Sequence, residues 1–562
     1  VVYEHGFTIS SVEAHQLQRL YHGVWIVFLA DVTLRILLEY KDTRRTFSKL
    51  TWILTILLYL TLIPVIFHRP GEEGGILQFW EFLHGKTYHL ILLLVFSFFN
   101  LSNGLVRLLG RRTNPSLILA VSFLIIIVIG TGLLMLPRCT VNGISWVDSL
   151  FISTSAVCVT GLTSVDVAST FTPTGFVVII LLIQIGGLGV MTLTSFFAMF
   201  FMGNTSLYNQ LVVRDMVSSN SLNSLLSTLV YILAFTLAIE GIGMLAIWGD
   251  IHGTMRMELQ EELAFSAFHA VSAFCNAGID LVGEASFAPF VTNPLINFTT
   301  MGLILLSGLG FPVWWEVMER VQELVKGKRP RKNFVRGFTL HTKLVLTTTM
   351  ILVFGGALLI LALDWNHAPS LGSLKPAQKV MAAFFQSVTT RTAGFETIPQ
   401  ADFSDSSAMV SMVLMFIGGS PMGTAGGVKT TTVAILVVLV ASYIRGDSDT
   451  VAWGRKVMEE NIRTAVVIFF FVLTTVFTAT VLLISVTGSP LLDCTYEIIS
   501  AVATVGLTRS LTPTLPFMGK VIVILVMFMG RIGPVTLAVA LRRRTGRKDV
   551  DIQRPEQRIL IG

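Results

Sequence analysis

Charged residues are scarce in this sequence. Lysine, arginine, aspartate and glutamate together make up only 13% of its 562 residues, whereas 53% of the residues are hydrophobic. A chain with so few charges and a mean hydropathy of +0.74 does not suit the surface of an ordinary soluble protein. Apolar stretches of about 20 residues, long enough to cross a bilayer as a helix, recur along its length. We therefore expect a polytopic membrane protein without a large soluble domain.

Residues that bind metals or form disulfides are also few. The four cysteines, Cys139, Cys158, Cys275 and Cys494, are widely spaced and form no CxxC pair, which argues against a zinc site or a disulfide framework. None of the ten histidines forms an HxxxH pair or is expected near carboxylates inside the bilayer, which argues against a membrane enzyme. The basic loops contain no GxGxxG after a strand pattern, so no nucleotide-binding domain is indicated.

Hydropathy predicts about eleven spanning helices. The positive-inside rule assigns the basic clusters between them to the cytoplasm, so the chain is expected to begin outside and end inside. The net charge of +6 then reflects topology and not a nucleic-acid-binding face. The basic clusters lie at 41–49, 107–112, 326–336, 445–456 and 542–548. The clearest predicted spans are 116–137, 174–201, 222–248, 293–319, 340–363, 407–444, 464–487 and 517–541, with weaker ones at 24–40, 50–67 and 88–109.

One short pattern returns four times on the side predicted to be external. The glycine in each copy recurs at intervals of 112 to 117 residues, which is the signature of an internal repeat. An amphipathic stretch of about three turns precedes each copy, so we expect four re-entrant helices that each end in a loop. The copies are "SAVCVTGL" (155–162), "SAFCNAGI" (272–279), "SVTTRTAGF" (387–395) and "SAVATVGL" (500–507).

These loops have the chemistry of a pore. Non-helical backbone at membrane depth is tolerated only inside protein or beside a water-filled cavity, because unpaired backbone groups in lipid cost several kcal/mol each. Four converging loops would direct carbonyl oxygens at one axis, where they suit a dehydrated monovalent cation. Glycine permits the backbone conformations this requires, and the preceding helices would aim their dipoles at the same axis. A packing or loop role would explain any single copy, but four copies in one topological position favour a pore.

Two further features lie within predicted spans. The segment "MFIGGSPMGTAGGVKTTTVAIL" (415–436) holds five glycines and a proline between Gly418 and Gly427. Interior glycine and proline destabilise a helix by about 1 and 3 kcal/mol each, so the helix must break there, either as a packed kink or as a functional loop.

Arg531 lies in the apolar span "MFMGRIGPVTLA". An arginine there costs at least about 2.5 kcal/mol, so it should face a cavity or a partner, and a buried ion pair that fixes packing is the alternative.

With these motifs the chain resembles the Trk/Ktr/HKT superfamily of potassium transport proteins over about residues 111–562. The resemblance implies an all-α integral membrane fold, with a fourfold pseudo-symmetric repeat of helix, re-entrant pore loop and helix, plus extra N-terminal transmembrane helices. It also implies potassium uptake across the cell membrane, and no enzymatic activity is expected. The implied units are accessory helices at 1–110 and pore repeats at 111–215, 216–335, 336–455 and 456–562, the third with a gating loop and the fourth with the C-terminal tail.

The resemblance further implies a potassium-selective filter made mainly of backbone carbonyls. The superfamily divides at its first filter glycine, where sodium-preferring plant members carry serine, and glycine stands at all four positions here. Glycine at these positions points to potassium. The implied filter residues are Val157, Cys158, Val159, Thr160, Gly161, Asn276, Ala277, Gly278, Thr392, Ala393, Gly394, Thr504, Val505 and Gly506.

A gate beneath the filter is implied as well. The 415–436 segment resembles an intramembrane gating loop, with a "KTTT" ending closer to the Ktr branch, and Arg531 resembles a pore arginine that resists cation passage and can hydrogen-bond loop oxygens. The implied assembly is a homodimer in the bacterial inner membrane, resting on cytosolic nucleotide-binding subunits of the RCK type, which "RPEQRILIG" (554–562) would help to contact. Potassium is the substrate, and no cofactor is implied. The implied gating residues are Gly418, Gly419, Ser420, Pro421, Gly423, Thr424, Ala425, Gly426, Gly427, Lys429 and Arg531.

Other charged residues have two interpretations. Acidic residues that follow the filter glycines could form an external vestibule that concentrates cations, or they could be solvated loop residues. Arg391 is expected to brace the third loop, and no role is assigned to Arg509. Glu240 is either a packing partner or a cavity residue, and His269 is expected to be a hydrogen-bonded core residue. The acidic residues are Asp166, Asp280, Glu284 and Glu396.

The residues leave two other functions open. A secondary transporter of an organic substrate would use inverted repeats, whereas these repeats share one orientation, which suits a pore better. A less selective monovalent cation channel also remains open, because selectivity depends on filter geometry. Sodium coupling and the role of the N-terminal helices are not determined by the residues.

Overall fold

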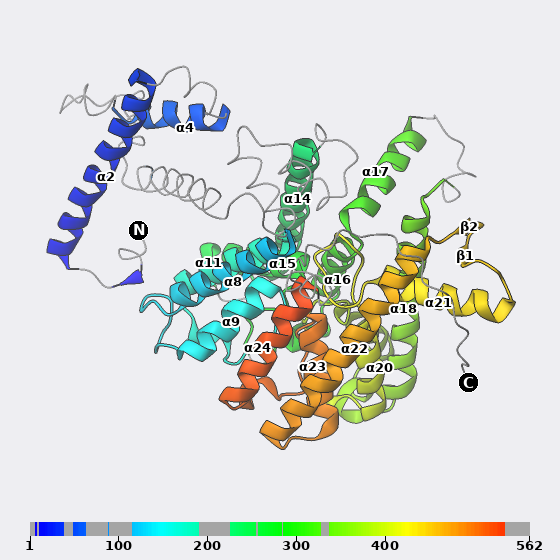
Figure 1. Cartoon of the computed structure of the whole chain (residues 1–562). Coiled ribbons are helices and arrows are strands. Elements are labelled where there is room, and N and C mark those ends of the chain that lie inside the picture. Colours follow the sequence, from blue (N-terminus) through cyan, green and yellow to red (C-terminus); the bar gives the residue numbers. More distant parts are fainter. Residues whose placement is uncertain are drawn as a thin grey trace.

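The structure is a computed structural model that describes residues 6–7, 10–38, 49–62, 88, 115–189, 225–254, 257–283, 285–326 and 337–533. Its helices α8 to α24 gather into one bundle, and α2 and α4 stand beside it (Figure 1). The only strands among the described residues are β1 (Val451–Ala452) and β2 (Arg455–Lys456), which pair antiparallel. The chain is therefore helical almost throughout its described part.

The helices of the bundle follow one order four times: a first helix, a shorter pore helix, and a second helix after the loop. The amphipathic helices expected ahead of the four loops are confirmed, and they are called pore helices for their predicted role. The first helices are α8 (Pro115–Leu134), α14 (Leu225–Ile251), α18 (Leu340–Asp364) and α22 (Glu459–Thr487). The pore helices are α9 (Trp146–Cys158), α15 (Leu259–Cys275), α19 (Pro376–Thr389) and α23 (Leu491–Ala503). The second helices begin with α11 (Pro173–Gly187), α16 (Pro294–Gly308), α20 (Asp405–Phe416) and α24 (Phe517–Ile532).

The remaining elements are short or peripheral. Near the N-terminus, α2 (Ser11–Leu38) packs against α4 (Lys49–Leu60), and Trp25 Nε1 donates a hydrogen bond of 2.7 Å to Thr61 Oγ1. The second helices of the middle repeats continue as α17 (Phe311–Val325) and α21 (Thr430–Arg445). Single turns lie in the external loops, namely α10 (Val167–Thr170), η2 (Ala288–Phe290), η4 (Ala368–Gly372), η5 (Gln400–Asp402) and η6 (Thr512–Thr514).

Length and composition allow four described helices to cross a membrane, and five if one bent pair counts as a span. The bent pair corrects the sequence analysis. The span expected at 293–319 is not one continuous helix, because the chain turns by 101° between α16 and α17. Gly310 has a positive φ of 84° at this bend, and Pro312 removes a helical hydrogen bond just after it. The four helices are α2, α14, α18 and α22, within the bounds His15–Leu38, Val230–Ile251, Leu340–Asp364 and Glu459–Thr487.

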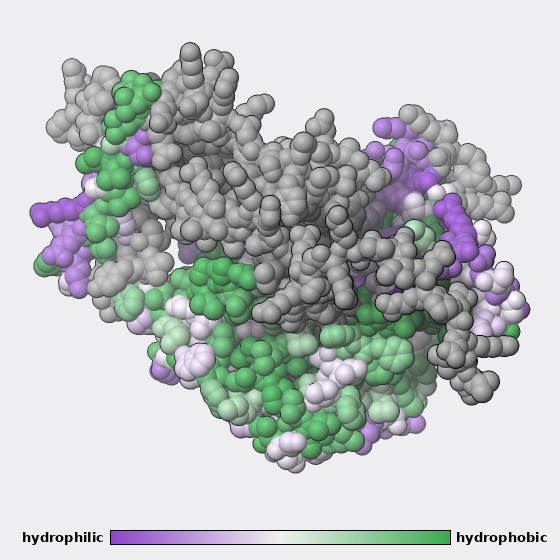
Figure 2. Space-filling model, viewed as in Figure 1, coloured by the Kyte–Doolittle hydropathy of each residue, from purple (hydrophilic) through white to green (hydrophobic). Residues whose placement is uncertain are grey.

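The break expected in the 407–444 span is confirmed, since residues 417–429 separate α20 from α21. The span expected at 174–201 begins as α11, but residues beyond 189 lie outside the described part, as do 88–109 except residue 88. Hydrophobic side chains spread over the bundle in the lower half of the view, whereas hydrophilic ones gather around α17 (Figure 2). This distribution fits a bundle surrounded by lipid.

The four repeats close into a ring. Each pore helix packs against the first helix of its own repeat and the second helix of the preceding repeat, with α24 serving as the predecessor of α9. At that closing contact, Lys520 Nζ lies 2.5 Å from Asp148 Oδ1, and both side chains are only 16% exposed. Within the first repeat, Ser153 Oγ donates a 2.8 Å hydrogen bond to the Ile127 carbonyl and so ties α9 to α8. The ring brings the ends of all four pore helices together.

Candidate functional site

The four loops, called filter loops 1 to 4 for their predicted role, share one backbone geometry. The residue two positions before each glycine has a positive φ although it is not glycine. Such a conformation costs roughly 1 to 2 kcal/mol for an L-residue and is rare for the β-branched valine and threonine found in three of the loops. Strain repeated four times indicates that the backbone direction matters to function. The φ values are 54°, 59°, 70° and 51° at Val159, Asn276, Thr392 and Thr504, and 93°, 65°, 84° and 97° at Gly161, Gly278, Gly394 and Gly506.

Each of these glycines lies against the carbonyl of the next loop. A Cβ atom added to Gly161 would lie 2.5 Å from the Ala277 carbonyl oxygen of filter loop 2. The relation repeats around the ring, so the four loops meet in the order 1, 2, 3, 4 and back to 1. No side chain fits at any of the four positions. The remaining pairs are Gly278 with the Ala393 oxygen, Gly394 with the Val505 oxygen, and Gly506 with the Thr160 oxygen.

Serine hydroxyls hold filter loops 1 and 4. Ser155 Oγ accepts a hydrogen bond of 3.0 Å from the Gly161 amide, six residues further on. Ser500 Oγ accepts the equivalent bond of 3.1 Å from the Gly506 amide. The two serines and the two glycines are buried, and a buried amide without a partner would cost about 1 to 3 kcal/mol. The hydroxyls therefore fix the direction of the glycine peptide.

Filter loops 2 and 3 use their hydroxyls in the opposite sense. Ser272 Oγ donates a 2.6 Å hydrogen bond to the Ile279 carbonyl, and Thr389 Oγ1 donates a bond of the same length to the Phe395 carbonyl. Filter loop 3 is one residue longer than the others, and the additional position is Arg391. Because of this insertion, the hydroxyl of filter loop 3 comes from Thr389, five residues before its glycine. In the other loops it comes from a serine six residues before the glycine.

Arg391 is buried behind filter loop 3, with 3% of its surface exposed. Its Nη2 donates a 2.6 Å hydrogen bond to the Leu414 carbonyl in the last turn of α20. Its Nε and Nη1 have no partner among the described residues. The contact agrees with the expectation that Arg391 braces this loop instead of contacting ions.

A cavity of about 440 Å³ opens directly above the ring. All four filter glycines line it, together with Asp166, Asp280 and Glu396. Three of the four acidic residues expected at the external mouth therefore share one vestibule, while Glu284 lies outside the described residues. Negative charge in such a confined mouth raises the local concentration of cations.

Ser286 links Asp280 to the backbone of Glu396 across two loops. Ser286 Oγ donates a 2.7 Å hydrogen bond to Asp280 Oδ2 and accepts one of 3.5 Å from the Glu396 amide. Burial, together with the nearby charges of Asp280 and Asp402, raises the pKa of Glu396 to about 8. Burial and the charge of Asp166 raise the pKa of Asp280 to about 6. At neutral pH the Asp280 side chain is mostly charged and the Glu396 side chain mostly neutral.

The vestibule should therefore gain a negative charge as external pH rises from 7 to 9. We expect the apparent KM for rubidium uptake to fall a few-fold over this range, because deprotonated Glu396 attracts cations to the mouth. Glu396→Gln should abolish that fall, as measured by initial uptake rates at each pH. Glu459→Gln, which removes an exposed carboxylate at the start of α22, is the control. An unchanged pH dependence in Glu396→Gln would rule out this origin.

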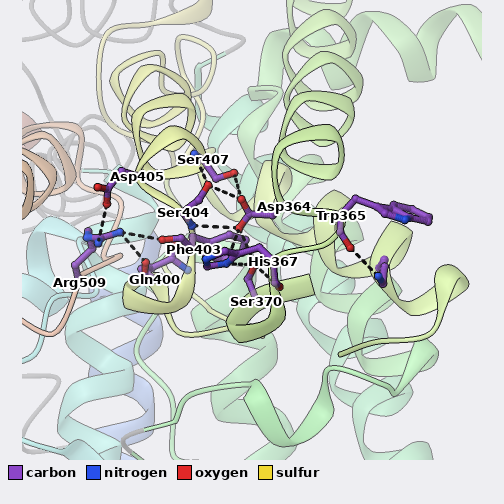
Figure 3. Close-up of polar contacts among 11 residues, drawn as sticks. Asp364, Trp365, His367, Ser370, Gln400, Phe403, Ser404, Asp405, Ser407 and Arg509 are labelled. Carbon is purple, nitrogen blue, oxygen red and sulfur yellow. Dashed lines mark hydrogen bonds and ion pairs between the residues drawn. The ribbon is translucent and has the colours of Figure 1, made fainter. Parts of the chain in front are cut away.

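The structure assigns Arg509 the role that the sequence left open. Its Nε lies 2.8 Å from Asp493 Oδ1 in α23, and its Nη1 donates a 3.2 Å hydrogen bond to the Gln400 carbonyl after filter loop 3. An Nη2 contact of 3.5 Å reaches Asp405 at the start of α20 (Figure 3). Arg509 thus joins the third and fourth repeats beside the vestibule.

A second polar cluster holds the same external segment where it enters α20. Asp364 accepts hydrogen bonds from the hydroxyls of Ser404 at 2.5 Å, Ser407 at 2.7 Å and Ser370 at 2.7 Å (Figure 3). Its carboxyl group is fully buried at the end of α18. The segment that leads from filter loop 3 into α20 is therefore held both by the end of α18 and by Arg509 of the fourth repeat.

The glycine-rich break, residues 417–429, lies directly beneath the ring. Thr424 Oγ1 donates a 3.3 Å hydrogen bond to the Phe274 carbonyl in the last turn of α15. A Cβ atom added to Gly426 would collide with the Thr504 hydroxyl of filter loop 4. Lys429 Nζ donates a 2.6 Å hydrogen bond to the Ala425 carbonyl within the segment. The segment therefore closes the space below two of the four loops.

The same segment is attached to the bend of α16 and α17. The Ser420 amide donates a 2.9 Å hydrogen bond to the Gly308 carbonyl, and the Phe311 amide donates one of 3.2 Å to the Met422 carbonyl. Each half of the bend thus contributes one backbone bond. The bend at Gly308–Phe311 and the break at 417–429 support each other, which explains why both helices are interrupted.

Arg531 reaches this segment from α24. Its Nη1 donates a 2.5 Å hydrogen bond to the Thr424 carbonyl, and its Nη2 donates one to the Gly186 carbonyl at the end of α11. The hydrogen bond expected with a loop oxygen is present. Both partners are carbonyls, and among the residues that the structure describes no carboxylate forms an ion pair with Arg531, so the alternative of a buried ion pair has no support there.

Two glycines of the second helices were missed by the sequence analysis. Added Cβ atoms on Gly186 and Gly530 would collide with the Val157 and Val502 carbonyls, which occupy equivalent positions at the ends of the first and fourth pore helices. A signal was available, because Gly-containing breaks recur at this point of every second helix. They are "IGGLG" (185–189), "SGLGFP" (307–312), "IGGSPMG" (417–423) and "MGRIGP" (529–534).

Gly530→Ala should therefore displace the last turn of α23. We expect the mutant to lose at least about half of its rubidium uptake or its potassium preference. This loss would occur although alanine is more favourable than glycine in a helix by about 1 kcal/mol. Gly241→Ala is the matched control, since Gly241 lies within α14 and has no atom within 4 Å of an added Cβ. Equal uptake and selectivity in both mutants would show that the contact with Val502 is unimportant.

Two buried polar residues have packing roles. His269 is fully buried, its Nδ1 lies 2.8 Å from the Phe265 carbonyl, and its Nε2 accepts a 3.2 Å bond from the Leu281 amide. The expected hydrogen-bonded core residue is confirmed. Glu240 is 5% exposed and accepts a 3.3 Å bond from Gln184 Nε2, so it joins α14 to α11.

A ring of backbone carbonyls below an acidic mouth, within a bundle of membrane helices, defines a membrane protein that conducts or transports cations. The model of the cation transport protein family TrkH matches residues 106–546, and the chain belongs to this family. The resemblance to the Trk/Ktr/HKT superfamily is thereby confirmed. The chain is a multi-pass protein of the cell membrane.

Characterised relatives cover most of the chain. It is 34% identical over 459 residues to the potassium/sodium uptake protein NtpJ of Enterococcus hirae, with 80% of this chain and 98% of that protein aligned. It is 34% identical to the Ktr system potassium uptake protein B of Bacillus subtilis, covering 80% and 97% of the two chains. The crystal structure of the potassium transporter TrkH from Vibrio parahaemolyticus matches with a TM-score of 0.61 at 17% identity, over 87% of this chain and 96% of that one. This match confirms the all-α membrane fold.

Proposed function

We propose that the protein takes up potassium through a pore whose selectivity filter is the ring of four loops. The observation that carries this proposal is the closure of the ring, in which every filter glycine lies against the carbonyl of the next loop. Such packing leaves backbone oxygens as the groups nearest the axis, and these suit a dehydrated potassium ion. The names of the aligned relatives, which describe potassium or potassium/sodium uptake, support the choice of ion.

The proposed ion ligands are the backbone carbonyls of residues 157–161, 276–278, 392–394 and 504–506. The dipoles of α9, α15, α19 and α23 point their C-terminal ends at the same place, where a cation is stabilised. The acidic vestibule then supplies cations from the external side. Binding at several similar sites permits both entry and release of the ion.

We place the gate in the segment at 417–429 together with Arg531. The segment lies under filter loops 2 and 4, and the guanidinium group of Arg531 adds a positive charge there. Passage would require the segment to move and the hydrogen bond between Arg531 and the Thr424 carbonyl to break. The bend at Gly308–Phe311, which is bonded to the same segment, would move with it.

The assembly is proposed by similarity to the aligned relatives. The name Ktr system potassium uptake protein B describes one component of a system, which supports a separate regulatory subunit for this chain. We propose a homodimer on cytosolic subunits with nucleotide-binding domains of the RCK type. Sodium dependence is proposed on the name of the Enterococcus relative, which includes sodium.

The test is rubidium uptake into proteoliposomes that contain the full chain, driven by an inward gradient and measured with and without competing sodium. We expect uptake that potassium inhibits at least tenfold more strongly than sodium, which corresponds to about 1.4 kcal/mol of discrimination. Liposomes without protein are the control. Absence of cation flux, with and without a cytosolic regulatory subunit, would overturn the proposal and favour the transporter of an organic substrate.

A further inference from the structure

A groove of about 480 Å³ opens on the side of the bundle between α16 and α18. Pore helix α19 forms its floor through Phe384 and Val388. Phe354 of α18 packs edge to face on Phe384 with ring centroids 5.4 Å apart, and so forms one wall. The outer rim includes Phe298 and Met350, which are 63% and 57% exposed. The groove thus leads from the surface of the bundle to a pore helix.

A glycine keeps this groove open. Gly302 lines it from α16, and an added Cβ there would have no atom within 4 Å. Most other glycines of the second helices and filter loops touch backbone, so this empty space is not a requirement of packing. A side chain at position 302 would begin in open space and extend into the groove.

The depth of the groove identifies what fills it. It is lined by residues 346–354 of α18, which spans 340–364. At 1.5 Å per residue these lie about 9 to 21 Å from the start of a helix about 37 Å long, well within the hydrocarbon region. Thr349 is the sole polar side chain among the lining residues that the structure describes. Ordered water needs two to four polar partners, so an apolar groove at this depth is filled by hydrocarbon.

The groove also has a direct connection to filter loop 3. Val388 on its floor is followed by Thr389, whose hydroxyl holds the Phe395 carbonyl next to the filter glycine Gly394. Next to Val388, Ser387 Oγ donates a 2.8 Å hydrogen bond to the carbonyl of Val353, a residue of α18 that also lines the groove. A displacement of Val388 would therefore move Thr389, the next residue, which is bonded to filter loop 3.

We infer that this groove is a binding site for an acyl chain of a bilayer lipid, which packs against α19 and supports filter loop 3. The site is separate from the ion pathway. Its occupation does not depend on the proposed function, whereas its effect on selectivity does. A second copy of the chain would be a different occupant, and the experiment below distinguishes the two.

The test uses the full chain in nanodiscs of phosphatidylcholine that carries a photoreactive diazirine on one acyl chain. After illumination, mass spectrometry should locate lipid adducts at Phe384, Val388 and Met301 on the floor of the groove. Gly302→Phe should lower these adducts at least fivefold, because the ring occupies the space. Gly241→Phe, at an equally open glycine of α14 outside the groove, should leave them unchanged.

Lipid adducts confined to the rim residues Phe298 and Met350, or equal adducts on the floor in Gly302→Phe, would overturn the inference. A protein-to-protein crosslink from a photoreactive residue at Met350 would overturn it as well, because a second chain would then cover the groove. Adduct formation is read without any transport assay. A failure of potassium uptake therefore remains distinguishable from a failure of this site.

Discussion

Gly161→Ser is expected to lower the preference for potassium over sodium at least tenfold in the proteoliposome assay. Gly161 has a φ of 93°, a conformation that L-residues rarely adopt, and an added Cβ would lie 2.5 Å from the Ala277 carbonyl oxygen and 3.2 Å from Gly506 Cα. Positive φ alone costs a non-glycine residue roughly 1 to 2 kcal/mol. The backbone must shift to relieve the collision, and the neighbouring carbonyl then leaves its place at the axis. A tenfold loss corresponds to about 1.4 kcal/mol of discrimination.

Backbone strain and loss of the ring can be separated by a second glycine. Gly143 has a φ of 80°, close to that of Gly161, but no atom lies within 4 Å of an added Cβ. Gly143→Ser should therefore show the cost of the conformation without any change in ion selectivity. If Gly161→Ser retained full selectivity while folding normally, the glycine ring would not be the filter.

The repeat was visible in the sequence because glycine carries a local requirement. The positive φ at each filter glycine is a property of one residue, and it is preserved wherever the same turn is needed. Amphipathic pore helices are likewise local, since an apolar stripe with a helical period can be found in a short window. These two signals located the loops, the order of helices and the break at 417–429.

The contacts between repeats could not be predicted in this way. The sequence does not show that Arg509 bonds to the Gln400 carbonyl, more than 100 residues away, or that Lys520 pairs with Asp148 across the closing contact of the ring. The bend after Gly308 was hidden for a related reason. Its span is apolar enough to pass as one helix, and the break depends on backbone bonds to the segment at 417–429. Such features depend on tertiary partners that short-range patterns do not contain.

Replacing Arg531 by glutamine is expected to raise rubidium flux at least tenfold in the absence of any regulatory subunit. Two unit charges 4 Å apart at an effective dielectric constant of 20 repel by about 4 kcal/mol, so a cation passing close to the guanidinium group meets a substantial barrier. The change also removes the hydrogen bonds to the Thr424 and Gly186 carbonyls that hold the segment in place.

The conservative change Arg531→Lys separates these two effects, because it keeps the charge and loses the two-pronged hydrogen bonding of the guanidinium group. If charge is the barrier, Arg531→Lys should conduct nearly as little as the wild type while Arg531→Gln leaks. If the hydrogen bonds hold the segment closed, both variants should leak equally. A flux that is unchanged or reduced in both would place the barrier elsewhere and remove Arg531 from the gate, since neither its charge nor its bonds to the segment would then oppose the ion.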